Sequence, residues 1–169
     1  VISDEMYEKI IYDGRKTVSL AGLPGMRQRT IIINGLSKSH AMTGWRLGFA
    51  VAPKALMSSM LKVQQHTATC AASFTQVAGV AALTGPQECV TQMLEVYRQR
   101  RDLVAAGLNS IRGLQCAAPE GAFYAFPSVA KLGLTSKQFA LRLLDEENVA
   151  VVPGSAFGSC GEGFVRISY

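Results

Sequence analysis

The segment NGLSKSHAMTGWRLGFAVAPK, residues 34–54, constrains the fold more than any other part of the chain. A small, polar loop bracketed by glycines lies there between two runs typical of strands, 29–34 and 45–52. The loop has about ten residues, whereas a parallel crossover usually needs a dozen or more and a helix. We therefore predict that the two strands are antiparallel neighbours. The first strand is apolar on both faces, which is typical of the centre of a covered sheet.

The remaining segments predict helices in the middle of the chain, followed by short strands and one further helix. Residues 1–3 are typical of a strand end, 4–11 of a short helix or turn, and 12–28 of a loop. We expect helices at 53–65, 73–83, 86–111 and 136–148, with Ser136 as the cap of the last, and short strands on both sides of the Pro119-Glu120-Gly121 turn and near the end of the chain. The division that follows is a first part at 1–85, a bridging helix at 86–111 and a small α+β part at 112–169.

Composition and charge exclude several classes of protein. Of the 169 residues 49% are hydrophobic and 17% charged, which is typical of a globular protein. No stretch reaches the roughly 18–20 apolar residues of a membrane span. The net charge of +5 is mild. The densest group of basic residues is Arg98, Arg100 and Arg101, which stand near Glu95 and Asp102. This mixture of charges predicts a solvent-exposed helix face. The sequence has no motif for binding nucleic acid.

The cysteines and histidines favour structural roles. The cysteines are far apart and none has CxxC spacing, so with only two histidines we expect no metal site. We expect reduced, mostly buried thiols, which are typical of a cytoplasmic protein. No targeting segment is visible in this sequence. His40 and His66 are interpreted as structural.

Lys38 stands among small residues that would let a flat ligand approach closely. A lysine in a loop is usually only solvated, but a lysine becomes a nucleophile toward a carbonyl when it is desolvated or near another cation. Arg46 could supply that cation and a fork of donors for a phosphate. A lysine that condenses with an aldehyde, beside an arginine that holds a phosphate, is what pyridoxal 5'-phosphate requires.

The N-terminal stretch offers two further groups for such a cofactor. A carboxylate keeps the pyridine nitrogen protonated and a phenol can bond the 3'-oxygen of the ring; Asp4 and Tyr7 are the candidates. Residues three apart on one strand face opposite ways. Both can therefore face one ligand only if the strand ends at about Asp4 and the chain then turns. An Asp at a strand end is also a common helix cap, and this alternative stays open.

Five blocks of sequence occur in an order that resembles the class I/II aminotransferases, which are pyridoxal-phosphate enzymes of the aspartate aminotransferase fold type. The blocks are SDEMY, NGLSKSHAMTGWRLGFAVAPK, PEGAFYAFP, VPGSAFG and GFVRISY. The resemblance covers the whole chain, which is similar only to the C-terminal part of such an enzyme. It implies an α/β fold, in which part of a large domain with a mixed, mostly parallel sheet is followed by a small α+β domain.

The resemblance also implies a role for each matching residue. Lys38 matches the lysine that forms the Schiff base with the cofactor and then moves the proton. Asp4 matches the carboxylate on the pyridine nitrogen and Tyr7 the phenol on the 3'-oxygen. Arg46 matches the phosphate arginine, and Arg166 the arginine that binds the substrate α-carboxylate.

Some positions depart from the family's pattern or have a second interpretation. Many relatives carry a phosphate-binding hydroxyl three residues before the lysine, where this chain has Gly35, so a phosphate contact by Ser37 is in doubt. Without the resemblance, Arg166 would be read as a strand residue paired with Glu162. Phe123 and Tyr124 either line the substrate pocket or pack inside the small domain; the sequence leaves both open.

The implied function is the transfer of an amino group from an amino acid to a 2-oxo acid through a Lys38 Schiff base, in a homodimer. Alternatives are a carbon–sulfur lyase or a synthase of the same fold, and a catalytically inactive chain. The side chain of the substrate cannot be read from these residues, although aspartate, aromatic or broad specificity is our preference. We expect residues 1–85 alone to fold poorly or associate because of an open apolar sheet edge.

Overall fold

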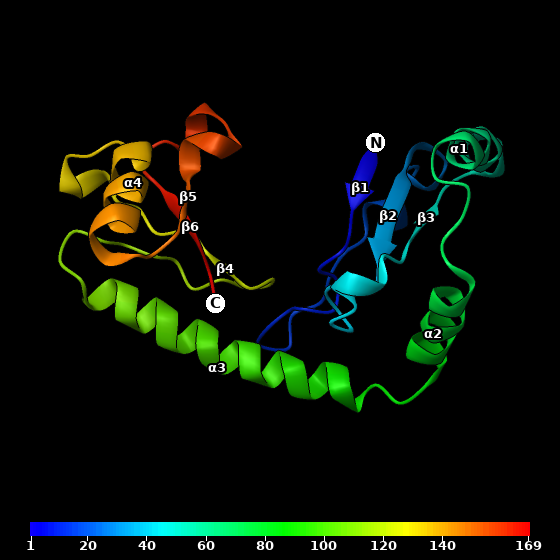
Figure 1. Ribbon diagram of the computed structural model, residues 1–169, viewed down its shortest axis with the longest axis horizontal. Coiled ribbons are helices and arrows are strands. Elements are labelled where there is room, and N and C mark those ends of the chain that lie inside the picture. Colours follow the sequence, from blue (N-terminus) through cyan, green and yellow to red (C-terminus); the bar gives the residue numbers. More distant parts are fainter. The chain divides into compact units, whose positions relative to one another are not determined.

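The computed structural model describes all residues, 1–169, and divides into two compact units, Val1–Met93 and Leu94–Tyr169. Each unit has its own small sheet, and Figure 1 shows their elements. The predicted α/β class is confirmed. The domain boundaries at 85 and 112 stay a prediction.

The first unit contains a mixed sheet of three strands in the order β1-β2-β3. These are β1 (Ile2–Asp4), β2 (Ile31–Gly35) and β3 (Gly48–Val51). β1 and β2 are parallel, whereas β2 and β3 are antiparallel, as the short loop between them predicts. β2 is the central strand, but its isoleucines Ile31–Ile33 are only half-buried in this chain.

Two helices follow in this unit, α1 (Lys54–Thr67) and α2 (Ser73–Thr84). Both agree with the predicted ranges to within two residues, and Pro53 is the residue just before α1. Residues 4–11 form no helix; a turn covers 6–9. The segment 10–12 contributes two fully buried side chains to this unit: Ile10 is 0% and Tyr12 1% exposed.

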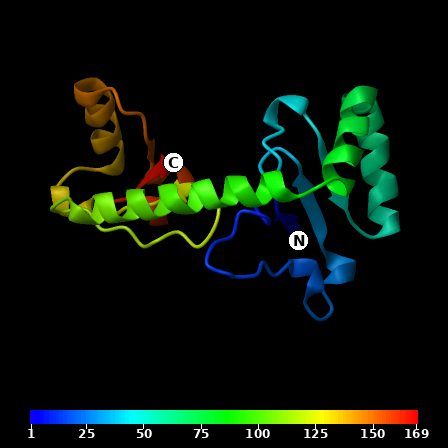
Figure 2. The same cartoon turned by 90° about the horizontal axis from the view of Figure 1, so that it is seen from below.

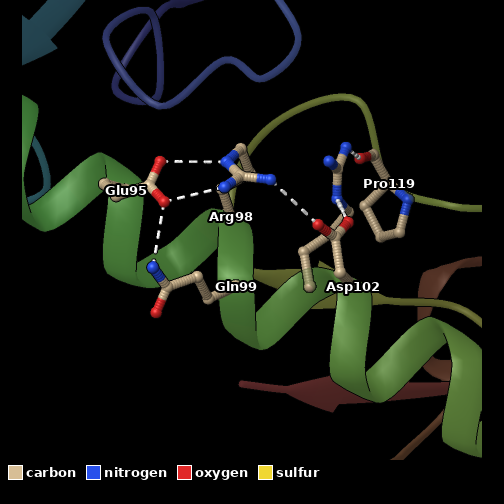
Figure 3. Close-up of polar contacts among 6 residues, drawn as sticks. Glu95, Arg98, Gln99, Asp102 and Pro119 are labelled. Atoms are coloured by element: carbon tan, nitrogen blue, oxygen red, sulfur yellow. Dashed lines mark hydrogen bonds and ion pairs between the residues drawn. The ribbon is translucent and has the colours of Figure 1, made fainter.

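The third helix, α3 (Glu88–Ser110), is the longest and runs through the boundary between the units (Figure 2). A network on its surface joins Glu95, Arg98 and Asp102 (Figure 3). Arg98 and Gln99 donate hydrogen bonds to Glu95 and lower the pKa of that carboxyl group to about 2. The predicted solvated face is therefore confirmed for Arg98.

The prediction of a solvated helix face is wrong for Arg101, whose side chain is buried. Arg101 is 5% exposed, and its guanidinium donates hydrogen bonds to the carboxylate of Asp102 at 2.7 Å and to the carbonyl oxygen of Pro119 at 3.1 Å. A buried guanidinium needs partners for its donors, and here a carboxylate and a carbonyl supply them. Spacing along the helix does not reveal a partner 18 residues away.

The second unit contains a small antiparallel sheet in the order β4-β6-β5. Its elements are β4 (Tyr124–Ala125), α4 (Ser136–Glu147), β5 (Val152–Pro153) and β6 (Val165–Ser168). Only one strand forms beside the Pro119-Glu120-Gly121 turn; the expected strand before it is reduced to a single bridge between Gln115 and Ser128. The core is made by Ala105, Cys116, Ala125, Val129, Ala140 and Val165.

The N-terminus of α4 corrects the predicted cap by one residue. Thr135 is the cap, and it exchanges side-chain-to-backbone hydrogen bonds with Gln138 in a capping box. Ser136 is instead the first residue of the helix and fully buried. Its backbone N–H and its hydroxyl both donate to the carboxylate of Glu162, at 2.7 and 2.8 Å.

The hydrogen bonds from Ser136 to Glu162 make the stability of the second unit depend on pH. They lower the pKa of Glu162, chiefly through the backbone N–H of Ser136. The pKa of Glu162 is therefore lower in the folded chain than its unfolded value of about 4.3. The stabilisation that ionised Glu162 gives the folded state is complete at pH values above this unfolded pKa, and it is lost as the pH falls through the folded pKa. We expect Glu162→Gln to be less stable than the wild type at neutral pH and to lose less stability below pH ~4. Urea unfolding as a function of pH measures this. Glu147→Gln, at the other end of α4, is the control and should keep the wild-type acid dependence.

Only one of the four cysteines is buried, so the predicted mostly buried thiols are wrong. Cys116 is buried, and burial raises the pKa of its thiol. Cys70, Cys89 and Cys160 are exposed; they lie in the loop between α1 and α2, in the first turn of α3 and in the 3-10 helix Ser159–Gly161, respectively. All four are free thiols. None of the helices is long and apolar enough to cross a bilayer.

Candidate functional site

Lys38 lies in a loop that packs tightly at both of its ends. Leu36 is 2% and Met42 8% exposed, and the backbone N–H groups of His40 and Met42 both donate to the carbonyl oxygen of Leu36. The hydroxyl of Thr43 closes the loop on the carbonyl oxygen of Ser37 at 3.0 Å. The loop is therefore anchored by buried apolar residues, and Lys38 is half-buried between them.

Gly35 lets two strands approach each other just before this loop. A Cβ atom there would lie 2.9 Å from the carbonyl oxygen of Leu47 and 3.0 Å from the Cα atom of Gly48. A side chain would therefore push β2 and β3 apart at the entry to the lysine loop. This close approach gives Gly35 a packing role.

The structure brings Tyr7 to Lys38. The Nζ atom of Lys38 lies over the ring of Tyr7, 6.0 Å from its centroid. β1 ends at Asp4 and the chain then turns over residues 6–9, which is the geometry that the two residues need to face one ligand. One carboxylate oxygen of Asp4 accepts a hydrogen bond from the backbone N–H of Met6 at 3.1 Å and so supports this turn; because no helix follows, Asp4 is not a helix cap.

Arg46 has a backbone conformation that is uncommon for its type. Its φ is 55°, in the left-handed region, directly after the short 3-10 helix Thr43–Trp45. Its guanidinium donates to the carbonyl oxygen of Thr43 at 2.8 Å, and the residue is exposed. Arg46 lines an open cleft of about 600 Å³, whose other walls are Ala41, Gly44, Trp45, Cys70, Ala71, Ala72, Phe74 and Thr75.

Arg166 belongs to the second unit and contacts two aromatic rings. Its Cζ atom lies over the rings of Tyr124 and Phe157, 4.5 and 4.9 Å from their centroids. Glu162, the partner that the sequence alone indicates, instead accepts hydrogen bonds from Ser136. The sequence indicates Tyr124 as a pocket or packing residue, whereas its pattern does not indicate Phe157.

The two histidines differ in their surroundings. The Nδ1 atom of His40 is 2.9 Å from the hydroxyl of the buried Ser39, and its Nε2 atom is buried without a hydrogen-bond partner. His66 is exposed at the end of α1. No group of three or more His, Cys, Asp or Glu side chains could hold a metal ion.

Within the first unit, the side chains have the chemistry that pyridoxal phosphate needs. Lys38 offers a primary amine for the aldehyde, Tyr7 a phenol, Asp4 a carboxylate and Arg46 a guanidinium for the phosphate. The lysine and the phenol lie together, and the carboxylate ends the adjoining strand. These residues therefore fit the cofactor.

The comparisons with known proteins agree with this chemistry. The family "Aminotransferase class I and II" matches residues 1–169. The chain is 52% identical over 171 residues to an aspartate aminotransferase of Pyrococcus abyssi and 48% identical to aromatic-amino-acid aminotransferase 2 of Thermococcus litoralis. In both cases all of this chain aligns with 44% of the relative.

Solved structures give the same result for the fold. An aromatic aminotransferase from Pyrococcus horikoshii superposes with a TM-score of 0.95 at 51% identity, over 99% of this chain and 45% of that one. An aspartate aminotransferase from Rhizobium meliloti superposes with a TM-score of 0.93 at 45% identity, over 99% of this chain and 44% of that one. The chain thus spans less than half the length of the relatives it matches, and it belongs to the class I and II aminotransferase family.

Proposed function

We propose that the chain is the C-terminal part of a pyridoxal-phosphate-dependent aminotransferase that moves an amino group from an amino acid to a 2-oxo acid. The observation that supports it best is the contact between Lys38 and Tyr7, which lies in the turn after β1, in a chain of this family. Bound pyridoxal phosphate would supply an aldehyde and an electron sink for the transfer.

Each residue of the chain has one proposed task. Lys38 anchors the cofactor covalently and then moves a proton as general base and acid. Asp4 holds a proton on the ring nitrogen, and Tyr7 donates a hydrogen bond to the 3'-oxygen. Arg46 binds the phosphate, and Arg166 binds the substrate α-carboxylate by a bidentate fork.

The partners and the location are part of the same proposal. Amino acids and 2-oxo acids are the proposed substrates, and names of relatives favour aspartate or aromatic side chains among them. A homodimer is the proposed assembly of the complete enzyme. A cytoplasmic location stays a prediction, made from the spacing of the cysteines.

Labelling of the purified chain tests the assignment of Lys38. Pyridoxal phosphate is added, the spectrum is recorded, borohydride is used to fix the adduct, and the modified lysines are mapped by mass spectrometry. We expect a yellow species and a pyridoxyl group on Lys38, because its amine is held beside a phenol. Lys38→Ala should lose both.

Lys54→Ala is the matched control, since Lys54 is an exposed lysine at the start of α1. This variant should keep the label on Lys38. A label spread over the surface lysines and unchanged in Lys38→Ala would contradict the proposed site in this chain and favour the inactive alternative. With an active preparation, ammonia and pyruvate in place of a new amino acid would indicate a lyase.

A further inference from the structure

Arg166 carries a charge that no acidic side chain of the second unit pairs with. The residue is half-buried on β6, and no hydrogen bond or ion pair joins its guanidinium to another residue. The nearby carboxylate of Glu162 is occupied by Ser136. The groups that contact the guanidinium are the rings of Tyr124 and Phe157, which we call the aromatic pair.

The aromatic pair comes from the chain segments on either side of β6: Tyr124 lies on β4, and Phe157 lies in the 3-10 helix that follows β5. Tyr124 on β4 is opposite Ser168, which lies on the same face of β6 as Arg166. A diagonal neighbour of this kind is within reach of an aromatic side chain. On the other side, Val152 of β5 is opposite Arg166, and the short 3-10 helix Gly154–Phe157 follows β5 directly.

Phe157 is itself held in place by other rings. It meets Phe126 edge to face at 6.0 Å between centroids, and Phe126 stacks on Phe164 at 5.3 Å. Phe157 is nevertheless 52% exposed, so it contributes little to the core. An exposed phenylalanine that contacts a guanidinium and the ring of Phe126 has a fixed position although it fills no core.

Aromatic rings restrain a guanidinium without using its N–H donors. The attraction acts on the face of the ring, and a ring accepts no conventional hydrogen bond from the edge of the guanidinium. A long side chain that is restrained before binding loses less entropy when a ligand arrives. The donors of Arg166 are thereby left for an anion, and a carboxylate matches their planar fork.

We propose that Phe157 and Tyr124 are positioning residues, which hold the guanidinium of Arg166 ready to bind the carboxylate of the substrate. This inference rests on the proposed function only for the identity of the ligand. The restraint itself belongs to the second unit and does not involve Lys38.

The test follows the Arg166 side chain by NMR in the full chain labelled with nitrogen-15. The Nε–Hε signal of Arg166, assigned with Arg166→Lys, is recorded during a titration with propanoate, and sodium chloride at equal ionic strength serves as the reference. In the wild type we expect propanoate, but not chloride, to shift this signal. Phe157→Leu should remove the contribution of Phe157 to the ring-current shift of the free state and raise the dissociation constant for propanoate by about 3- to 10-fold.

Two further variants separate positioning from general damage. Phe157→Tyr keeps a ring and should restore both the signal and the affinity. Phe139→Leu removes a ring from α4, in the same unit, and should change neither. The inference is overturned if propanoate leaves the Arg166 signal of the wild type unmoved, or if Phe157→Leu and Phe139→Leu weaken binding equally.

Labelling of Lys38 by pyridoxal phosphate distinguishes this inference from the proposed function. Phe157→Leu should leave that labelling unchanged. If the wild type fails to label at Lys38 but Phe157→Leu still weakens propanoate binding, the positioning role stands and the proposed cofactor site does not.

Discussion

Gly154→Ala is expected to destabilise the second unit by about 3 kcal/mol. Gly154 and Gly161 are both buried and their backbones touch. A Cβ atom on Gly154 would overlap the carbonyl oxygen of Gly161 and lie 2.6 Å from that of Phe164. The backbone N–H of Gly154 also donates to the carbonyl oxygen of Phe164 at 2.8 Å, so the segment cannot move away without losing this bond.

Hydrogen exchange of the amides of β6, or urea unfolding followed in the second unit, measures the loss. The control is Gly107→Ala, because Gly107 is an exposed glycine in α3 where a Cβ atom would meet nothing within 4 Å. That substitution should stabilise the helix by about 0.5–1 kcal/mol. Equal effects of the two substitutions would show that the contact between Gly154 and Gly161 is not a constraint in solution.

Tyr12→Ala is expected to cost the first unit about 3–5 kcal/mol, since removing a fully buried aromatic side chain leaves a cavity. Tyr12 is 1% exposed and is the largest fully buried side chain in the chain. It lies between β1 and β2, in a segment without helix or extended strand.

The protection of the amide of Glu5 against hydrogen exchange measures this effect, because that N–H donates to the carbonyl oxygen of Ile33 and so reports on the ladder between β1 and β2. Val18→Ala is the control: Val18 is an apolar residue of the same loop but 72% exposed, and its replacement should change stability by less than about 0.5 kcal/mol. Protection that survives Tyr12→Ala would mean that this loop is not part of the core.

These two predictions concern contacts that the local pattern of the sequence could not reveal. Tyr12 stands in a run rich in glycine and charge, which reads as loop, and only the path of the chain shows that it fills the core. Gly154 and Gly161 read as turn residues, and their contact depends on how two short 3-10 helices meet. Burial is a property of what packs against a residue, and hydrophobic periodicity reports on one element at a time.

The sequence by itself determined the features that depend on near neighbours. The short loop makes β2 and β3 antiparallel, since a parallel crossover does not fit in about ten residues. Helical spacing and Pro53 located the helices, and the motif blocks identified the family that the comparisons confirm. The five candidate site residues also come from those blocks, and their roles stay proposals.

The tertiary structure alone decided which distant groups become partners. Thr135 caps α4 in place of Ser136, whose backbone N–H and hydroxyl donate to the carboxylate of Glu162, 26 residues away. Glu162 pairs with Ser136, and so Arg166 lacks the acidic partner that spacing along the sequence indicates. The rings of Tyr124 and Phe157 contact its guanidinium instead. Hydrogen bonds and ring contacts depend on distances of a few ångströms in space, which residue spacing fixes only within one helix, strand or turn.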